Sequence, residues 1–245
     1  MRPLLTALLT ALLTALLLLL APDSSPGADA TSSPPAATLS IAMAGDSTMA
    51  SVLKAPADRP NLAGWGQCLQ ACLPAHCRVT NLARSGASSK SFRDLGLWQR
   101  VLDCKAQWVI IQFGHNDQPG KGPARQTDAS GSYRDNLRRF ITEARAQGSK
   151  PILVTSVARR TFDSQGKLQD SLAPYAEATR IVAKETQVPL IDLHRMSLEL
   201  FTQLGPQQSN RFGPADSDRT HFSREGAKEI AQLVSRQLLP ILSAP

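Results

Sequence analysis

The chain has 245 residues, and its 27 Lys and Arg against 20 Asp and Glu give a formal net charge of +7 at pH 7. The basic residues are scattered, with no block as long as a nucleic-acid-binding arm, so the composition argues against a nucleic acid partner. About 215 residues follow the N-terminal segment described next, which is enough for one domain with a sizeable core. No second domain boundary is visible after Pro35.

The first thirty residues have the parts of an export signal. Arg2 supplies a positive charge, residues 4–21 are an unbroken run of Leu, Ala and Thr, and Ala28-Asp29-Ala30 offers a small-residue cleavage site. The alternative is an uncleaved anchor, because the run is near the lower length limit for spanning a bilayer. We predict a signal peptide at 1–30, a flexible exit segment at 31–37 and one domain at 38–245. The mature protein is then secreted or periplasmic, without stable membrane association.

Apolar runs and helical spacings alternate along the rest of the chain. Five short segments, mostly continuous apolar runs, predict strands at residues 39–44, 78–81, 108–113, 150–155 and 188–193. Apolar residues at helical spacing predict helices at residues 64–73, 133–146, 172–186, 196–204 and 223–239. This alternation indicates the α/β class, as a three-layer α/β/α sandwich around a five-stranded parallel sheet. Residues 118–132 and 205–218 lack periodicity and are expected to be loops on the ligand side of the sheet.

The chain has four cysteines: Cys68 and Cys72 lie in the helix predicted at residues 64–73, and Cys77 and Cys104 each precede a predicted strand. In an exported chain an even number of cysteines favours disulfides, so we expect two, with Cys72–Cys77 and Cys68–Cys104 preferred among three possible pairings. A zinc site is the alternative, in which His76 would join the cysteines as a ligand. It is disfavoured because His76 adjoins Cys77 and is not spaced for a tetrahedral site.

Ser47 is the candidate nucleophile. It lies in the turn Gly45-Asp46-Ser47-Thr48, directly after the first predicted strand. In open α/β sheets the ligand crevice lies at the carboxyl ends of the strands, where such a serine can present its hydroxyl. The alternative is a serine that only caps the following helix. Asp46 is expected to anchor the turn by accepting backbone hydrogen bonds.

His221 is the candidate base. Of the four histidines it alone has an acidic residue, Asp218, three positions earlier, on a segment that then becomes a helix. This spacing lets Asp218 bond one ring nitrogen while the other faces the serine, which fixes the tautomer and stabilises the imidazolium. The alternative is a buried histidine satisfied by a backbone carbonyl.

Three groups are candidates for an oxyanion hole: the backbone N–H of Ser47, the backbone N–H of Gly86 and the side-chain amide of Asn116. Asn116 lies in Gly114-His115-Asn116-Asp117, directly after the third predicted strand, and the alternative is that it is only a turn residue. His115 and Asp117 are expected to be structural supports.

The order of these motifs resembles the SGNH, or GDSL, hydrolases. The longer motifs are similar to those of the rhamnogalacturonan acetylesterases. They are Gly-Asp-Ser-Thr-Met from residue 45, Phe-Gly-His-Asn-Asp-Gln from residue 113 and Asp-Arg-Thr-His-Phe from residue 218. The resemblance implies a flavodoxin-like sandwich, a triad of Ser47, Asp218 and His221, and the oxyanion donors already named. It also implies an exported esterase without metal or organic cofactor, acting on an acetylated, acidic pectin. Ala87 departs from the subgroup, in which Arg usually follows the oxyanion glycine.

Two other functions stay open on the sequence. One is a lipid-directed member of the family, such as a lysophospholipase or thioesterase, which would need a long apolar groove. The other is a polysaccharide-binding domain that has lost its chemistry, against which the intact set of Ser47, Asn116, Asp218 and His221 argues. The sequence leaves open which glycan and hydroxyl carry the acetyl group, and whether the chain forms oligomers.

Overall fold

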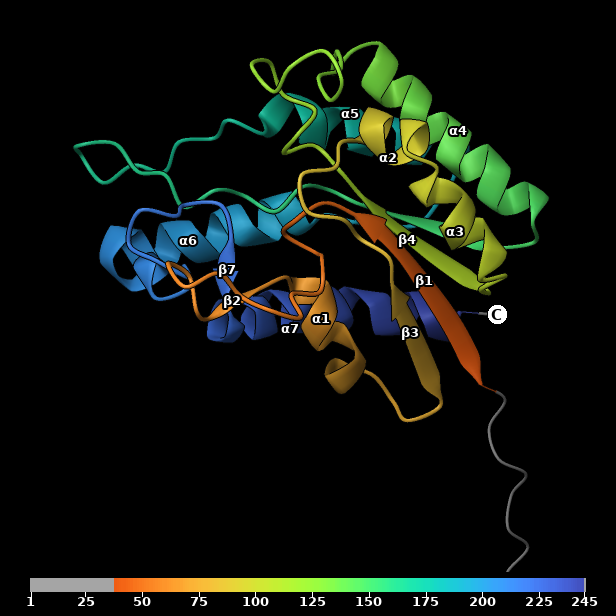
Figure 1. Cartoon of the computed structure of the whole chain (residues 1–245), viewed down its shortest axis with the longest axis horizontal. Coiled ribbons are helices and arrows are strands. Elements are labelled where there is room, and N and C mark those ends of the chain that lie inside the picture. The colour runs from red at the N-terminus through yellow and green to blue at the C-terminus, as the bar shows by residue number, and fades with distance from the viewer. Residues whose placement is uncertain (1–37, 245) are drawn as a thin grey trace, which may run out of the picture. The chain divides into compact units, whose positions relative to one another are not determined.

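The structure is a computed structural model that describes residues 38–244, and a five-stranded, all-parallel sheet forms its centre (Figure 1). The strand order is β3-β1-β4-β5-β6. The strands are β1 (Leu39–Gly45), β3 (Cys77–Asn81), β4 (Trp108–Gln112), β5 (Lys150–Val154) and β6 (Leu190–Ile191). All five lie within the runs predicted to be strands or extend them by one residue, and the predicted α/β sandwich is confirmed. The last strand is shorter than predicted because Asp192 caps a helix that begins at Leu193.

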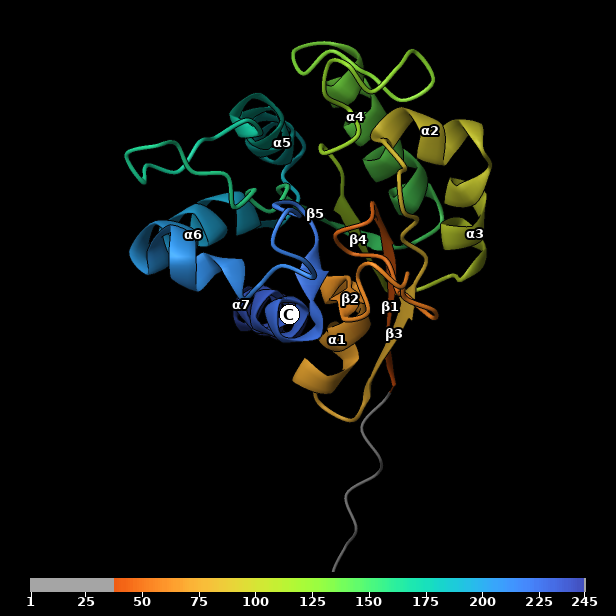
Figure 2. The same ribbon diagram turned by 60° about the vertical axis from the view of Figure 1, so that its left-hand side comes forward.

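Helices cover both faces of the sheet, as Figures 1 and 2 show. Side chains of β1 alternate between the two faces: Ile41 and Met43 belong to one buried cluster, and Ala42 and Ala44 belong to the other. The first cluster packs under α1 (Trp65–Leu69), α6 (Leu193–Asn210) and α7 (Arg224–Ser243). The second packs under α2 (Ser89–Asp94), α3 (Leu97–Asp103), α4 (Ser132–Ala146) and α5 (Ala173–Thr186).

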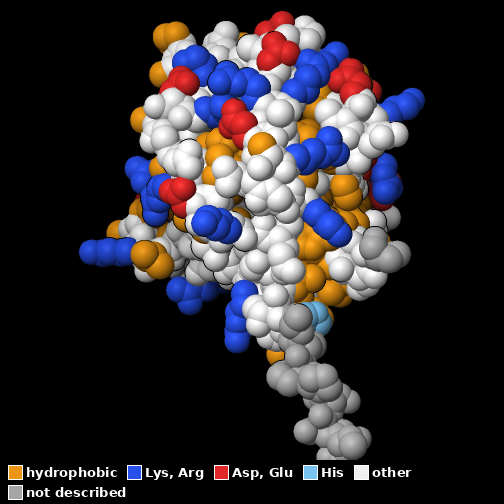
Figure 3. Space-filling model, turned by 90° about the vertical axis from the view of Figure 1, so that its right-hand side faces the viewer, with side chains coloured by type: hydrophobic (Ala, Val, Ile, Leu, Met, Phe, Trp, Pro, Cys, Tyr) orange, Lys and Arg blue, Asp and Glu red, His pale blue; other side chains and the backbone are white. Residues whose placement is uncertain are grey.

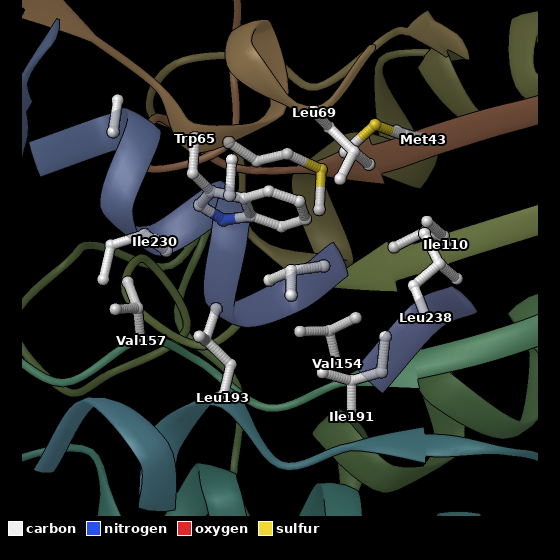
Figure 4. Packing of buried hydrophobic residues seen from close by; sticks show 14 of the residues in the cluster. Met43, Trp65, Leu69, Ile110, Val154, Val157, Ile191, Leu193, Ile230 and Leu238 are labelled. Carbon is white, nitrogen blue, oxygen red and sulfur yellow. The ribbon is translucent and has the colours of Figure 1, made fainter. Parts of the chain in front are cut away.

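The first cluster packs helices α1 and α7 against the sheet. Figure 4 shows Trp65 and Leu69 of α1 packed with Met43 of the sheet, and Ile230 and Leu238 of α7 in the same cluster. Trp65 is fully buried, and its indole N–H donates to Gln112 Oε1 of β4 at 2.7 Å. The segment after β1 is therefore anchored to the neighbouring strand.

A second, two-stranded sheet joins the segment after Ser47 to the segment after His221. Its strands β2 (Leu62–Ala63) and β7 (Phe222–Ser223) are antiparallel, with Ala63 opposite Phe222. The backbone N–H of Trp65 donates to the Thr48 carbonyl at 2.8 Å. Sequence periodicity did not predict this pair, because two residues per strand are too few to show a period.

Two helices were not predicted. Helix α2 begins with a reciprocal cap in which Ser88 and Ser91 each accept the other's backbone N–H, and Gly96, with φ of 69°, separates it from α3. Six and seven residues are too few for a clear 3.6-residue period.

The prediction of a loop at residues 205–218 is wrong in its first part. Gly205 (φ 68°) interrupts α6, as its position before Pro206 suggested, but the helix resumes and ends at Asn210. Proline is well suited to the first turn of that second piece. Residues 118–131 contain no helix or strand, as predicted.

The two predicted disulfides are a further error, because Cys68, Cys72, Cys77 and Cys104 are all free thiols in the structure. Cys68 lies in α1 and Cys72 in the 3-10 helix η1 (Gln70–Cys72), while Cys104 ends α3 on the opposite face of the sheet. A Cys68–Cys104 bond would have to cross the sheet. The Cys72 thiol instead donates to the Cys68 carbonyl at 3.6 Å.

The predicted signal peptide, residues 1–30, and the exit segment, residues 31–37, lie outside the described residues, and these predictions stay predictions. Between residues 38 and 244 we find no helix with the length and hydropathy needed to cross a bilayer.

Candidate active site

Four separate segments bring the predicted site residues to one edge of the main sheet. Ser47 follows β1, Gly86 follows β3 and Asn116 follows β4, all beyond the carboxyl ends of parallel strands. His221 directly precedes β7 of the small sheet. Ser47, Gly86, Asn116 and His221 together line a hollow of about 640 Å³, which we call the catalytic hollow.

The serine, the histidine and the aspartate form a continuous hydrogen-bonded relay. Ser47 Oγ lies 2.9 Å from His221 Nε2, and His221 Nδ1 lies 2.9 Å from Asp218 Oδ2. With Asp218 ionised, Nδ1 carries the proton and donates to the carboxylate, which leaves Nε2 free to accept from the serine hydroxyl. The geometry is that required for proton transfer from Ser47 to His221.

Asp218 is held ionised by its own turn. Partial burial alone would raise its pKa, but the backbone N–H groups of His221 (2.8 Å) and Thr220 (3.0 Å) and the charge of the His221 ring outweigh it, and the pKa falls to about 2. Arg59 adds an ion pair at 3.3 Å from Nη1 to Asp218 Oδ2. Asp218 is thus a fixed negative partner for the imidazole.

Arg160, which the sequence did not single out, fastens both ends of this turn. Its Nη2 donates to the Asp218 carbonyl at 2.8 Å and to the His221 carbonyl at 2.6 Å, and its side chain is almost fully buried. The guanidinium also lies 4.9 Å from the ring centroid of Phe222. Burial lowers the pKa of Arg160 to about 10, so it remains charged at neutral pH. Its position shortly after β5, at the carboxyl edge of the sheet, could have indicated a role at the site. The chain has many other arginines, however, and the sequence did not distinguish Arg160 from them.

The residues of the three predicted oxyanion donors all line the catalytic hollow. The backbone N–H groups of Ser47 and Gly86 donate to no residue within 38–244. Gly86 has φ of 78°, a conformation that favours glycine, and the turn it makes leaves its N–H available. Asn116 gives one amide hydrogen to the Ala87 carbonyl at 3.0 Å and keeps the other. Ala87, the residue that departs from the subgroup, thus acts here through its backbone.

A buried network fixes the turn that carries Ser47. Asp46 Oδ1 accepts the Thr48 N–H at 2.9 Å and the Thr48 hydroxyl at 2.8 Å, and Gln112 Nε2 donates to Thr48 Oγ1 at 2.8 Å. His115 Nδ1 lies 3.2 Å from Asp46 Oδ2. Burial opposes ionisation of Asp46, but His115 and the two Thr48 donors outweigh it, and the pKa of Asp46 is lowered. Asp46 anchors the turn as expected from the sequence.

Asp117 holds the loop of Asn116 and is buried. It accepts from the backbone and hydroxyl of Ser89, from the Gly114 N–H and from the Thr127 hydroxyl. Burial, with a smaller contribution from Asp46, raises the pKa of Asp117 to about 7 against these donors. Asp117 and His115 therefore contact the supporting structure and not the catalytic hollow.

The sequence did not predict that part of the segment 51–62, including Lys54 and Arg59, lines the catalytic hollow. A second hollow of about 580 Å³, which we call the outer hollow, adjoins it and shares Arg59 and His221. Of the two loops expected at the crevice, residues 205–218 contribute Ala215, Ser217 and Asp218 to the outer hollow. The other loop reaches the site through Gln118, which bonds Arg159.

A Ser-His-Asp relay facing backbone N–H groups, at the carboxyl edge of a parallel sheet, is the arrangement of α/β serine hydrolases. Comparison with known proteins narrows this class. A family model described as the GDSL-like Lipase/Acylhydrolase family matches residues 43–229, and the chain belongs to this family. The resemblance seen in the motifs is confirmed; the catalytic role of each residue stays a prediction.

Two curated relatives come from Bacillus subtilis (strain 168). The chain is 36% identical over 211 residues to "Rhamnogalacturonan acetylesterase RhgT", covering 80% of this chain and 88% of the relative. It is 37% identical over 201 residues to "Probable rhamnogalacturonan acetylesterase YesY", covering 80% and 90%.

Solved structures share the fold. Protein YxiM of Bacillus subtilis superposes with a TM-score of 0.73 at 28% identity, over 86% of this chain and 58% of that longer chain. Axe2, an acetylxylan esterase from Geobacillus stearothermophilus, superposes with a TM-score of 0.61 at 20% identity, over 85% of this chain and 96% of that chain. The second likeness supports the fold alone.

Proposed function

We propose that this protein is a serine esterase that removes O-acetyl groups from a polysaccharide, with acetylated rhamnogalacturonan as the favoured substrate. The observation that carries the proposal is the relay from Ser47 Oγ through His221 to Asp218, with 2.9 Å at each step. The identity of 36–37% to rhamnogalacturonan acetylesterases supports the choice of ester and of polymer.

In the proposed mechanism His221 Nε2 accepts the Ser47 proton as the hydroxyl oxygen attacks the acetyl carbonyl carbon. The oxyanion that forms is stabilised by the N–H groups of Ser47 and Gly86 and by the Asn116 amide. His221 then gives its proton to the sugar oxygen as the ester bond breaks, which leaves an acetyl-serine. A water molecule, deprotonated by the same imidazole, attacks this ester, and acetate leaves with Ser47 restored.

The lining of the catalytic hollow favours a sugar over a lipid. Hydroxyl, amide and cationic residues line it, including Ser51, Ser85, Asn116 and Lys54, and the apolar lining consists of Val52, Leu53, Pro56 and Leu62. Its largest exposed apolar residue, Leu53, has a side chain that projects into solvent and encloses nothing. A long acyl chain would need enclosed apolar surface to bind tightly. The lipid-directed alternative is therefore not favoured, and the intact relay of Ser47, His221 and Asp218 argues against the non-catalytic alternative.

The charge around the site favours an acidic polymer over a neutral one such as xylan. Lys54 and Arg59 line the catalytic hollow, and Arg59, Arg159 and Arg219 line the outer one. On the face that Figure 3 shows, Lys and Arg side chains occur at many separate places. Cations concentrated at a cleft raise the local concentration of an anionic substrate.

The proposal includes export, because residues 1–30 have the pattern of a signal peptide and pectic polymers lie outside the cytoplasm. The mature protein would act in the periplasm or after secretion, and the relay requires no cofactor for this chemistry.

The test is acetate release from a panel of acetylated rhamnogalacturonan, acetylated homogalacturonan, acetylated xylan and p-nitrophenyl esters of two to eight carbons. We expect the highest kcat/KM among polymers on rhamnogalacturonan and the highest among small esters on the acetate. A clear preference for the octanoate would contradict the polysaccharide assignment, and a preference for xylan would contradict the choice of pectin.

A further inference from the structure

The outer hollow lies where a polymer would leave the catalytic hollow. The two hollows share Arg59 and His221, so a sugar chain with its acetyl group at Ser47 can continue past His221 into the outer one. Its volume of about 580 Å³ is close to that of the catalytic hollow, about 640 Å³. The outer hollow can therefore hold a neighbouring part of the substrate.

Two guanidinium groups in the outer hollow have only neutral partners. Arg159 donates from Nη1 to Thr220 Oγ1 at 3.1 Å and from Nη2 to Gln118 Oε1 at 2.7 Å. Arg219 donates from Nη1 to the side-chain oxygen of Asn210. Within residues 38–244, no carboxylate oxygen lies within 4.0 Å of either guanidinium. Their charges are therefore available to an anionic ligand.

Burial lowers the pKa of Arg159 and the charges of Asp46 and Asp218 act against this, but within residues 38–244 no acid forms an ion pair with Arg159 or Arg219. Asp218 contacts His221 and Arg59, at 2.9 and 3.3 Å. Asp58 lies 3.5 Å from Arg59 Nε, with its side chain 75% exposed. Both carboxylates thus lie against Arg59, while Arg159 and Arg219 face the hollow from the other segments.

We propose that the outer hollow is a subsite for the carboxylate of a uronic acid, held by Arg159 and Arg219, in a sugar close to the one whose acetyl group lies at Ser47. Guanidinium groups match a carboxylate with paired N–H donors, which an unsubstituted neutral sugar cannot exploit. The Thr161 and Ser217 side chains line the same hollow and offer hydroxyl partners to the sugar. The inference rests on the proposed function and deepens it, because it names the charged group that the site selects and where it binds.

Arg219 is the residue to change first, because its side chain is exposed and bonds only Asn210. The readout is kcat/KM on acetylated rhamnogalacturonan divided by kcat/KM on p-nitrophenyl acetate, measured with the exported protein. We expect Arg219→Ala to lower this ratio about fivefold, as for an exposed ion pair, and the double variant Arg159→Gln/Arg219→Ala to lower it more than tenfold. Arg219→Gln, which can still bond Asn210, should behave as Arg219→Ala does.

The control is Arg211→Ala, which removes the same charge from an exposed residue that lines neither hollow and is paired with Glu225. Its ratio should stay within twofold of the wild type. Raising NaCl from about 0.05 to 0.5 M should lower the wild-type ratio and leave that of the double variant nearly constant.

Two failures are distinguishable. If the wild type releases acetate from rhamnogalacturonan and the double variant, folded by circular dichroism, keeps the full ratio, the subsite is wrong and the proposed function stands. If the wild type cleaves p-nitrophenyl acetate but no acidic polymer, the proposed substrate is wrong and the subsite falls with it.

Discussion

Replacing Arg160 by methionine tests whether this buried cation positions the turn from Asp218 to His221. The change removes two hydrogen bonds from Nη2, to the carbonyls of Asp218 and His221. Hydrogen bonds from a charged donor contribute about 1.5–3 kcal/mol each, so their loss costs about 3–6 kcal/mol.

Relief of the buried charge offsets this loss. Nε and Nη1 of Arg160 are buried without a hydrogen-bond partner in residues 38–244, and each such group costs about 1–3 kcal/mol. Methionine can fill the space beside Phe201 and Phe222 without that penalty. We therefore expect the free energy of unfolding of Arg160→Met to stay within about 2 kcal/mol of the wild type.

Activity should respond much more strongly. Without Arg160 the turn can shift, and a displacement of about 1 Å in a catalytic group lowers the rate about 100-fold. We expect kcat on p-nitrophenyl acetate to fall about 100-fold with little change in KM. Arg160→Lys, which can still reach one carbonyl, should recover part of the loss.

The assay pairs steady-state kinetics with urea unfolding followed by circular dichroism. Arg100→Met, on an exposed position of α3, is the matched control and should change neither quantity. A folded Arg160→Met with kcat within twofold of the wild type would refute the positioning role. A loss of more than about 5 kcal/mol in unfolding free energy would show that the offset is miscalculated.

Three further predictions concern the relay and its donors. Ser47→Ala should abolish p-nitrophenyl acetate hydrolysis without changing the unfolding midpoint; a folded variant with full activity would contradict the nucleophile assignment. Asn116→Ala should lower kcat about 10²–10³-fold, as expected for one oxyanion donor, and an unchanged kcat would leave Asn116 as a turn residue only. Because the pKa of Asp218 falls from 3.8 to about 2 on folding, its ionised form contributes about 2 kcal/mol above pH 4, which is lost as the pH drops toward 2. The stability difference between wild type and Asp218→Asn, from urea titrations, should therefore shrink over that interval, and a constant difference would refute the pKa assignment.

The sequence predicted what depends on local pattern. Most of the five strands are apolar runs long enough to recognise, and Ser47 and Asn116 lie just after the ends of two of them, where topology places them together. His221 was found from the spacing to Asp218. Gly86 could be assigned because its motif stands after β3. Helices α2 and α3 and the small sheet were missed because they are too short to show a period.

Contacts between distant segments could not be predicted from one sequence. Arg160 and the carbonyl of Asp218 are 58 positions apart, and Arg59 and Asp218 are 159 apart. No local sequence pattern pairs these residues, because the chain has many arginines and any of them could be the partner of Asp218. The disulfide prediction failed for a related reason: counting cysteines says nothing about which side of the sheet each one occupies.

The site is built from two separately supported halves, and the hydrogen bond between Ser47 and His221 is one of the contacts that join them. The network of Asp46, Thr48 and Gln112 fixes Ser47 to the main sheet, whereas Arg160 and the small sheet fix His221. The hydrogen bond from the Trp65 backbone N–H to the Thr48 carbonyl is another such contact, because only Gly64 separates Trp65 from β2. The 2.9 Å contact from Ser47 to His221 thus depends on the register of Ala63 opposite Phe222. A change that shifts this register would separate nucleophile from base while leaving both of their immediate supports intact.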